Sequence, residues 1–181
     1  MKKALFLDRD GIINIDHGYV YKKEEFEFVT GIFDLCRHAQ QAGYNIYVIT
    51  NQSGIGRGKY TEQEFHMLSK WMVNEFKKHS VTISDVYFCP HHPEKAKPEY
   101  LKSCKCRKPE PGMILKAAQD YSIDLANSVF IGDKISDMKA AQNAGIPSRV
   151  LVSSAYGDDI EISAIRVKNV EDIINTAVFV R

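Results

Sequence analysis

Short apolar runs alternate along the chain with segments whose apolar residues recur at helical spacing. The apolar runs span residues 3–8, 45–50, 83–89, 128–133 and 149–152, and the helical pattern spans 30–41, 61–76, 112–121 and 135–144. We also expect an edge strand within 160–167 and a last helix over 170–178. Strands alternating with helices indicate βαβ units. The sequence therefore predicts an α/β fold, a Rossmann-like and mostly parallel sheet with helices on both faces.

Three of the apolar runs end at a polar residue. Asp8, Thr50 and Asp133 each stand at the carboxyl end of a predicted strand. The carboxyl ends of parallel strands share one edge of the sheet, and ligands of such folds bind beyond that edge. We therefore expect these three side chains to lie together, although they are far apart in the chain.

An acidic turn, Asp8-Arg9-Asp10-Gly11, follows the first strand. Two carboxylates at this spacing can divide labour, one as nucleophile and metal ligand and the other as acid and base. Gly11 permits the tight turn that brings both to one site. Asp133 would complete a site for magnesium, which prefers a few oxygen ligands. Taken alone, the same turn also suits a solvated loop with a local ion pair.

Groups suited to binding phosphate occur elsewhere in the sequence. Thr50, Asn51 and the amides of the turn after them can hold phosphate oxygens, and Lys108 or Lys134 can neutralise charge that develops on a phosphoryl group. Phosphoryl transfer depends mostly on positioning and on neutralising such charge. The combination indicates phosphoryl chemistry.

A proline-rich loop without apolar periodicity carries Cys89, His91 or His92, Cys104 and Cys106. Three thiolates and one imidazole suit tetrahedral zinc, and a closed site with four protein ligands is structural. Either histidine can supply the fourth ligand, and three buried or free thiols are the alternative. The remaining cysteine, Cys36, lies on the apolar face of a predicted helix and is expected in the core.

Seven strings of the sequence together resemble the haloacid dehalogenase superfamily of phosphatases, and they extend over essentially the whole chain. They lie at 6–11, 16–19, 48–54, 57–59, 89–93, 104–109 and 131–134. Within the superfamily they look most like phosphatases that remove the 7-phosphate of a heptose 1,7-bisphosphate. Ile12 departs from the Thr or Val common there, which should affect packing more than chemistry. Residues 11–30 form only a short segment and 90–109 is the one sizeable loop, so we expect no large cap domain.

The resemblance also implies roles for individual residues. Asp8 would attack phosphorus, Asp10 would act as acid and then base, and Thr50 and Lys108 would stabilise the phosphoryl group. Mg²⁺ would be held by the Asp8 carboxylate, the Asp10 carbonyl and the Asp133 carboxylate. Structural Zn²⁺ would be held by Cys89, His91, Cys104 and Cys106. The substrate would be contacted by Arg9, Gly11, Asp16, His17, Gly18, Tyr19, Asn51, Gln52, Ser53, Arg107 and Lys134.

Composition restricts the partners that we expect. The 24 basic and 23 acidic residues leave a formal net charge of +1, which argues against a nucleic-acid or membrane-surface partner. No apolar run reaches the length of a signal peptide or a membrane helix, so we expect a cytoplasmic protein. We expect residues 1–181 to form one monomeric domain with an inserted zinc loop, 89–109, acting on a small sugar bisphosphate.

Two alternatives remain open from the sequence. Histidinol-phosphate phosphatases share the acidic turn and a similar zinc loop, but they more often carry Asp where this chain has Ser53. A zinc-loop module that binds nucleic acid or protein on a degenerate phosphatase fold is the other alternative. The near-neutral charge and the intact set of phosphatase strings argue against it.

Overall fold

The computed structural model describes residues 1–153 and 162–179. Its centre is a six-stranded, fully parallel sheet in the order β3-β2-β1-β4-β5-β6. The strands are β1 (Lys3–Leu7), β2 (Tyr44–Asn51), β3 (Ile83–Cys89), β4 (Val129–Gly132), β5 (Ser148–Val152) and β6 (Ile165–Val167). The expected parallel α/β sheet is confirmed.

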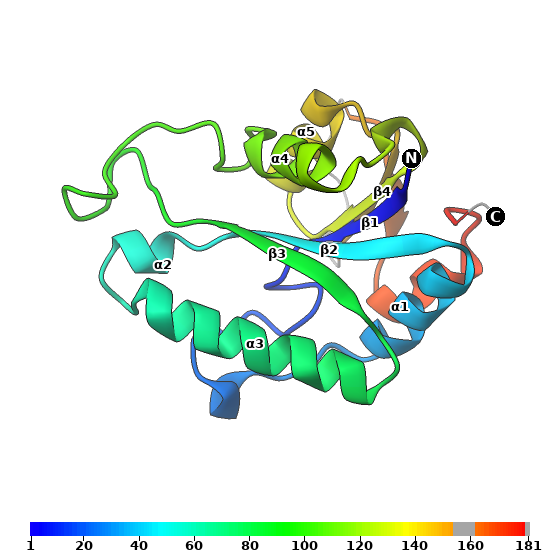
Figure 1. The fold of residues 1–181 in the computed structure, drawn as a ribbon, viewed down its shortest axis with the longest axis horizontal. Coiled ribbons are helices and arrows are strands. Elements are labelled where there is room, and N and C mark those ends of the chain that lie inside the picture. Colours follow the sequence, from blue (N-terminus) through cyan, green and yellow to red (C-terminus); the bar gives the residue numbers. More distant parts are fainter. Residues whose placement is uncertain (154–161, 180–181) are drawn as a thin grey trace.

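Helices cover both faces of this sheet, as Figure 1 shows. The α-helices are α1 (Ile32–Gln41), α2 (Ser53–Gly56), α3 (Glu62–Lys78), α4 (Gly112–Tyr121) and α5 (Ile135–Ala144). Short 3₁₀ helices are η1 (Lys23–Glu25), η2 (Leu125–Asn127) and η3 (Val170–Asn175). Helices α4 and α5 pack together on one face, and α1 packs with η3 on the other, where α3 also lies.

Strand β1 contributes side chains to the hydrophobic core on each face of the sheet. Leu5 and Leu7 belong to the core on the α1 and α3 side, whereas Ala4 and Phe6 belong to the core on the α4 and α5 side. All four side chains are fully buried. Successive side chains of a strand point to opposite faces, so a central strand covered on both sides must be apolar throughout.

The start of α3 is encoded locally. Thr61 Oγ1 accepts a hydrogen bond from Glu64 N, and Glu64 Oε1 accepts one from Thr61 N, each at 3.1 Å. This is the capping box that the sequence predicts, and it satisfies two amides that a helix start leaves unpaired. The apolar stripe that follows, which includes Phe65 and Met72, is buried against the sheet.

Local structure differs from expectation at two places. The three glycines at 54–58 favour a flexible turn, but Ser53–Gly56 forms the short helix α2. The helix expected over 170–178 forms only at Val170–Asn175, as the 3₁₀ helix η3. Its buried residues, Val170 and Ile173, are three apart, which suits the three-residue turn of a 3₁₀ helix. The edge strand expected within 160–167 forms as β6, while residues 160–161 lie outside the described residues.

Two long connections reach the carboxyl edge of the sheet. One joins β1 to α1 and contains η1, and the other, residues 90–111, joins β3 to α4 and extends past α2 in Figure 1. Lys97 N donates to Gly56 O at 2.7 Å, which attaches the second connection to α2. A Cβ on Gly56 would lie 2.5 Å from Pro90 O, so glycine permits this close approach. The described residues form no separate cap domain.

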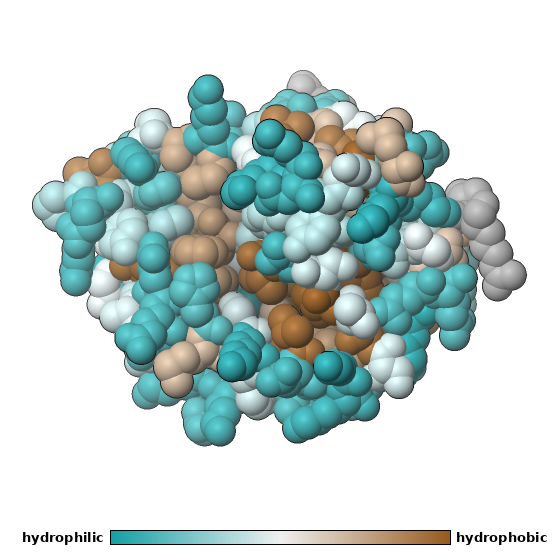
Figure 2. Space-filling model, viewed as in Figure 1, coloured by the Kyte–Doolittle hydropathy of each residue, from teal (hydrophilic) through white to brown (hydrophobic). Residues whose placement is uncertain are grey.

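Figure 2 shows a mostly hydrophilic face, with hydrophobic residues near its centre, where β3 and α3 lie in Figure 1. Strand β3 is an edge of the sheet, and Val73 and Val86 are only partly buried against the core there. Across residues 1–153 and 162–179, no helix combines the length and the apolar character needed to cross a bilayer.

Candidate active site

The carboxyl ends of β1 and β4 lie side by side at the point where the strand order reverses. Asp8 follows β1, Asp133 follows β4, and Asp8 N donates to Ile131 O at 3.1 Å. Asp137, from the first turn of α5, joins them, and the three carboxylates place oxygen atoms within 4.8 Å of one another. The predicted meeting of the first two acids is confirmed at the usual ligand site of such sheets.

Gly11 makes this approach possible. Its φ is +93°, a conformation that side chains disfavour. A Cβ at Gly11 would lie 2.1 Å from Asp133 Oδ2 and 2.6 Å from Asp133 Cγ. Because glycine carries only a hydrogen at this point, the Asp133 carboxylate can occupy the space beside the acidic turn.

Lys108 joins the connection of residues 90–111 to the acidic site. Its Nζ lies 2.9 Å from Asp8 Oδ1 and 2.6 Å from Asp137 Oδ1, and it donates to Ile49 O at 2.9 Å. These three acceptors occupy all three ammonium donors. Asn51 fixes the Lys108 backbone, accepting from Lys108 N at 3.0 Å and donating to Lys108 O at 3.2 Å. The Asn51 amide is therefore engaged by the protein.

Burial and charge shift the pKa values at this site. Burial raises the pKa of Asp8 well above its usual value, Asp137 raises it further, and Lys108 opposes both. Burial lowers the pKa of Lys108, but the carboxylates of Asp137 and Asp8 outweigh that effect, so the net shift is upward. Burial, followed by Asp137, also raises the pKa of Asp133. One lysine faces three acids, so a cation beside them would relieve the excess negative charge.

The donor set fits a hard divalent cation. Asp133 Oδ1 is buried and has no hydrogen-bond partner among the described residues. Asp137 has both oxygens engaged, because Oδ1 faces Lys108 while Oδ2 accepts from Asp133 N at 3.2 Å and Lys134 N at 3.1 Å. Asp8 and Asp133 are thus the carboxylates available to a metal, whereas Asp137 holds Lys108.

Asp10 is held by three side chains. Its Oδ1 accepts from Arg9 Nη2 at 2.8 Å and from Asn14 Nδ2 at 3.0 Å, and its Oδ2 accepts from Gln52 Nε2 at 3.1 Å. The Arg9 side chain is 2% exposed and also donates to Val20 O at 2.7 Å. Nη2 of Arg9 is engaged by Asp10 and the backbone, whereas Nε and Nη1 are buried without a hydrogen-bond partner among the described residues. The expected contact of Arg9 with substrate stays a prediction. Asn14 was not anticipated, since no motif marks it.

A cavity of about 230 Å³ opens beside Asp10. It is lined by Arg9, Asp10, Asp16, Gly18, Tyr19, Asn51, Gln52, Ser53, Gly54, Tyr60 and Lys134. Most residues that were expected to contact substrate therefore come together, and Gly54 and Tyr60 are additions. Three expected residues, Gly11, His17 and Arg107, are not part of this lining. His17 Nε2 lies 3.2 Å from Glu27 Oε2 beside a neighbouring groove.

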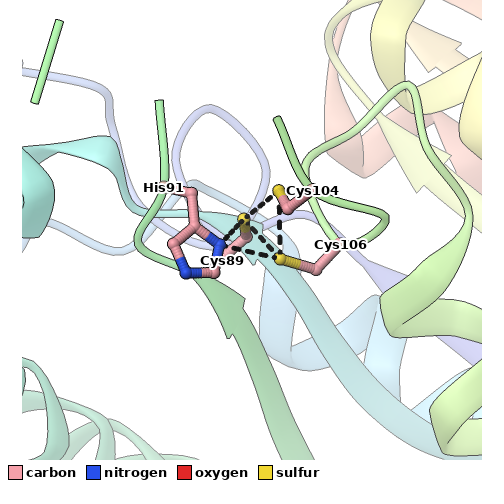
Figure 3. A group of neighbouring side chains, drawn as sticks. All are labelled: Cys89, His91, Cys104 and Cys106. Atoms are coloured by element: carbon pink, nitrogen blue, oxygen red, sulfur yellow. Dashed lines mark hydrogen bonds between the residues drawn. The ribbon is translucent and has the colours of Figure 1, made fainter. Parts of the chain in front are cut away.

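The three loop cysteines and His91 converge, as Figure 3 shows. Cys104 Sγ lies 3.5 Å from Cys89 Sγ and 3.4 Å from Cys106 Sγ, while the pair Cys89 and Cys106 is closer, at 2.7 Å. His91 Nδ1 lies 3.6 Å from Cys89 Sγ and 3.4 Å from Cys106 Sγ. A tetrahedral zinc site needs about 3.8 Å between sulfurs and about 3.6 Å between sulfur and nitrogen. The ligand types and their convergence fit zinc, with the sulfurs of Cys89 and Cys106 moving apart by about 1.1 Å to hold it.

The structure also decides between the two histidines. His92 Nδ1 accepts hydrogen bonds from Glu94 N at 3.1 Å and Lys95 N at 2.9 Å, so it supports the loop backbone instead. Hydrogen bonds from neighbouring thiols, first that of Cys89, lower the pKa of Cys106 to about 5. Arg107 N lies 3.4 Å from Cys104 Sγ, which links the cluster to the segment that carries Lys108.

Known proteins share these features. A family model described as HAD-hydrolase-like matches residues 105–173. A D-glycero-beta-D-manno-heptose-1,7-bisphosphate 7-phosphatase of Vibrio cholerae is 48% identical over 83% of this chain and 81% of its own length. The corresponding alpha-heptose enzyme of Campylobacter jejuni is 47% identical over 96% of this chain and 94% of its own.

A solved structure agrees with these sequence relatives. It is a D,D-heptose 1,7-bisphosphate phosphatase from B. bronchiseptica in complex with magnesium and phosphate, with a TM-score of 0.82, 27% identity and 96% coverage of each chain. The fold and the acidic site define a HAD-like hydrolase, a phosphoric monoester hydrolase. Within that class, the chain belongs to the family of D-glycero-D-manno-heptose-1,7-bisphosphate 7-phosphatases.

Proposed function

We propose that the protein hydrolyses the 7-phosphate of D-glycero-D-manno-heptose 1,7-bisphosphate and releases heptose 1-phosphate and inorganic phosphate. The observation that carries the proposal is the buried contact of Asp8 with Lys108 and Asp133 at the switch point of the sheet, in a chain of this family. Relatives named for the alpha and the beta sugar are 47% and 48% identical, so the proposal includes both anomers.

The first step transfers the phosphoryl group to Asp8. A carboxylate oxygen of Asp8 attacks phosphorus while the bond from phosphorus to the sugar oxygen breaks. Lys108 holds Asp8 and places positive charge beside the phosphorus. Thr50 Oγ1 accepts from Gln52 Nε2 at 2.8 Å, and its own proton, which faces Asn51 O at a long 3.4 Å, can turn to a phosphoryl oxygen.

Asp10 moves the protons. In its protonated form it gives a proton to the departing sugar oxygen, because an alkoxide is a poor leaving group. The resulting carboxylate then takes a proton from water as the water oxygen attacks phosphorus. The bond between phosphorus and Asp8 breaks, which restores the Asp8 carboxylate and releases phosphate. The cycle leaves Asp10 protonated again.

We further propose Mg²⁺ as the catalytic ion, held by the carboxylates of Asp8 and Asp133 and the backbone carbonyl of Asp10. The unpartnered oxygen of Asp133 and the surplus of carboxylates over lysine support this assignment. The relative from B. bronchiseptica was solved with magnesium and phosphate. Bound there, the ion supplies charge neutralisation for the phosphoryl oxygens.

Structural Zn²⁺ is proposed for Cys89, His91, Cys104 and Cys106. The convergence of three sulfurs and one ring nitrogen supports it. Residues 90–111 contain no helix or strand, so a metal is the natural means of ordering them. Order there matters to catalysis because Lys108 lies two residues after Cys106.

Substrate contacts are proposed for the polar residues around the cavity. Asp16, Tyr19, Ser53 and Lys134 line it directly, and the turn at Gly18 is held by Gly18 N donating to Asp16 Oδ1 at 3.0 Å. Arg107 remains a candidate for the second phosphate, because the segment that carries it also supplies Lys108 to the site. We propose a cytoplasmic monomer that acts as a single domain in the supply of activated heptose for surface glycans.

The test is phosphate release from both anomers of heptose 1,7-bisphosphate with Mg²⁺, beside histidinol phosphate. We expect turnover of at least one heptose anomer, far above that of histidinol phosphate, and its loss in Asp8→Asn. Faster hydrolysis of histidinol phosphate would refute the substrate assignment. Full activity of Asp8→Asn would instead refute Asp8 as the nucleophile.

A further inference from the structure

The side chain of Gln52 joins two reacting groups to a buried tyrosine. Gln52 Nε2 donates to Asp10 Oδ2 at 3.1 Å and to Thr50 Oγ1 at 2.8 Å, and Gln52 Oε1 accepts from the hydroxyl of Tyr60. Gln52 is 2% exposed and Tyr60 is 5% exposed. This connection brings together the proposed acid-base residue, Asp10, and the Thr50 hydroxyl that is proposed to bind the phosphoryl group.

The chemistry of the partners fixes the direction of each hydrogen bond. In the step in which Asp10 is a carboxylate it can only accept, so the amide nitrogen of Gln52 faces Asp10 and the amide oxygen faces Tyr60. Both amide hydrogens are then used, and the oxygen receives the tyrosine proton. The Gln52 amide has no unused donor with which to bind substrate.

We propose that Gln52 and Tyr60 are positioning residues for proton transfer by Asp10. Gln52 holds the second oxygen of Asp10, while Arg9 and Asn14 hold the first, so the carboxyl cannot pivot away from the leaving oxygen. The same amide turns the Thr50 hydroxyl proton away from itself. The assignment rests on the proposed role of Asp10 and extends it to two residues of the cavity wall whose polar atoms are engaged by the protein.

Packing holds the Tyr60 ring in place, so its hydroxyl stays directed at Gln52. Its ring stacks on Tyr21, with centroids 5.2 Å apart and planes 9° from parallel, and it is buried with Ile55 and Phe65. A Cβ on Gly54 would lie 2.3 Å from Tyr60 Cε1, so glycine at that position makes room for the ring. Burial raises the pKa of Tyr60, which keeps its hydroxyl a donor. Groups locked from behind in this way hold a site in its productive geometry.

Tyr60→Phe tests the assignment, with Tyr21→Phe as the matched control. Both changes remove one hydroxyl from the same ring stack, but the Tyr21 hydroxyl makes no hydrogen bond within the described residues. We would measure single-turnover rates with Mg²⁺ for phosphate monoesters whose leaving groups range from alkyl alcohols to p-nitrophenol. Proton donation matters most for alcohols, and it contributes about 10²–10⁴-fold in enzymes.

We expect Tyr60→Phe to slow the alkyl esters by about 10-fold and p-nitrophenyl phosphate by less than about 2-fold, with KM unchanged. Gln52→Leu, which removes both donors, should slow the alkyl esters by about 100-fold. Tyr21→Phe should match the wild type throughout. Melting temperatures of all three variants would show whether each is folded at the assay temperature.

An equal loss for every leaving group, or an effect on KM alone, would overturn the positioning role. So would a Tyr60→Phe enzyme indistinguishable from Tyr21→Phe. The substrate proposal is tested separately, and it is wrong if the wild-type enzyme hydrolyses simple esters but leaves heptose bisphosphate intact. Because the comparison of leaving groups uses only simple esters, its result does not depend on whether heptose bisphosphate is the substrate.

Discussion

Gly11→Ala tests the close approach of the acidic turn to Asp133. The added Cβ would lie 2.1 Å from Asp133 Oδ2, whereas ordinary contact begins at 3.4 Å, so the carboxylate must withdraw by about 1.3 Å. A misplacement of about 1 Å in an active site can cost about 100-fold in rate. We therefore expect kcat to fall by about 100-fold.

The same change strains the backbone. At a φ of +93°, alanine costs about 1–2 kcal/mol more than glycine. The collision with Asp133 adds to this, so we expect a loss of about 2–4 kcal/mol. For a chain of this size that lowers Tm by about 4–12 °C. Because Asp133 is a proposed ligand, the Mg²⁺ concentration that gives half-maximal activity should rise by about 10-fold.

Gly145→Ala is the matched control. Its φ is +87°, close to that of Gly11, but a Cβ there meets no atom within 4 Å among the described residues. It should lower Tm by about 2–6 °C and leave kcat and the Mg²⁺ dependence unchanged. Scanning calorimetry and phosphate release at several Mg²⁺ concentrations measure both effects. If Gly11→Ala and Gly145→Ala behave alike, the steric argument at Asp133 is wrong.

Three further outcomes are expected. Elemental analysis of the purified protein should find about one zinc per chain, which Cys106→Ser should lose together with thermal stability; a full zinc content in that variant would contradict the ligand set. Cys36→Ser should keep its zinc but lose about 1–3 kcal/mol in urea unfolding, because the hydroxyl enters an apolar core. Lys108→Met should lower the free energy of unfolding by about 3–5 kcal/mol, because it leaves the Asp137 carboxylate buried without its partner. Asp137→Asn added to that variant should restore part of the loss, because asparagine carries no charge. No recovery in the double variant would argue against that ion pair.

Features encoded by neighbours in the chain could be predicted from the sequence. The run around Leu5 and Phe6 is apolar on both faces, and the capping box at Thr61 needs only residues three apart. Expectations failed where local signals were weak. Three glycines and one isoleucine at 54–58 suggested a turn, yet packing against the loop at Pro90 accompanies a helix there.

The sequence by itself determined the parallel sheet, the acids at its carboxyl edge and the cysteine cluster, because periodicity and short motifs carry that information. Only the tertiary structure decided that Asp137 holds Lys108 and that Tyr60 reaches Gln52. It also brings His91 and not His92 to the cysteines, which the family resemblance implies but the residues alone leave open. These outcomes depend on which side chains of separate segments face one another, and on the hydrogen bonds that each has left to make. Such contacts arise from packing between elements and leave no periodic trace in the chain.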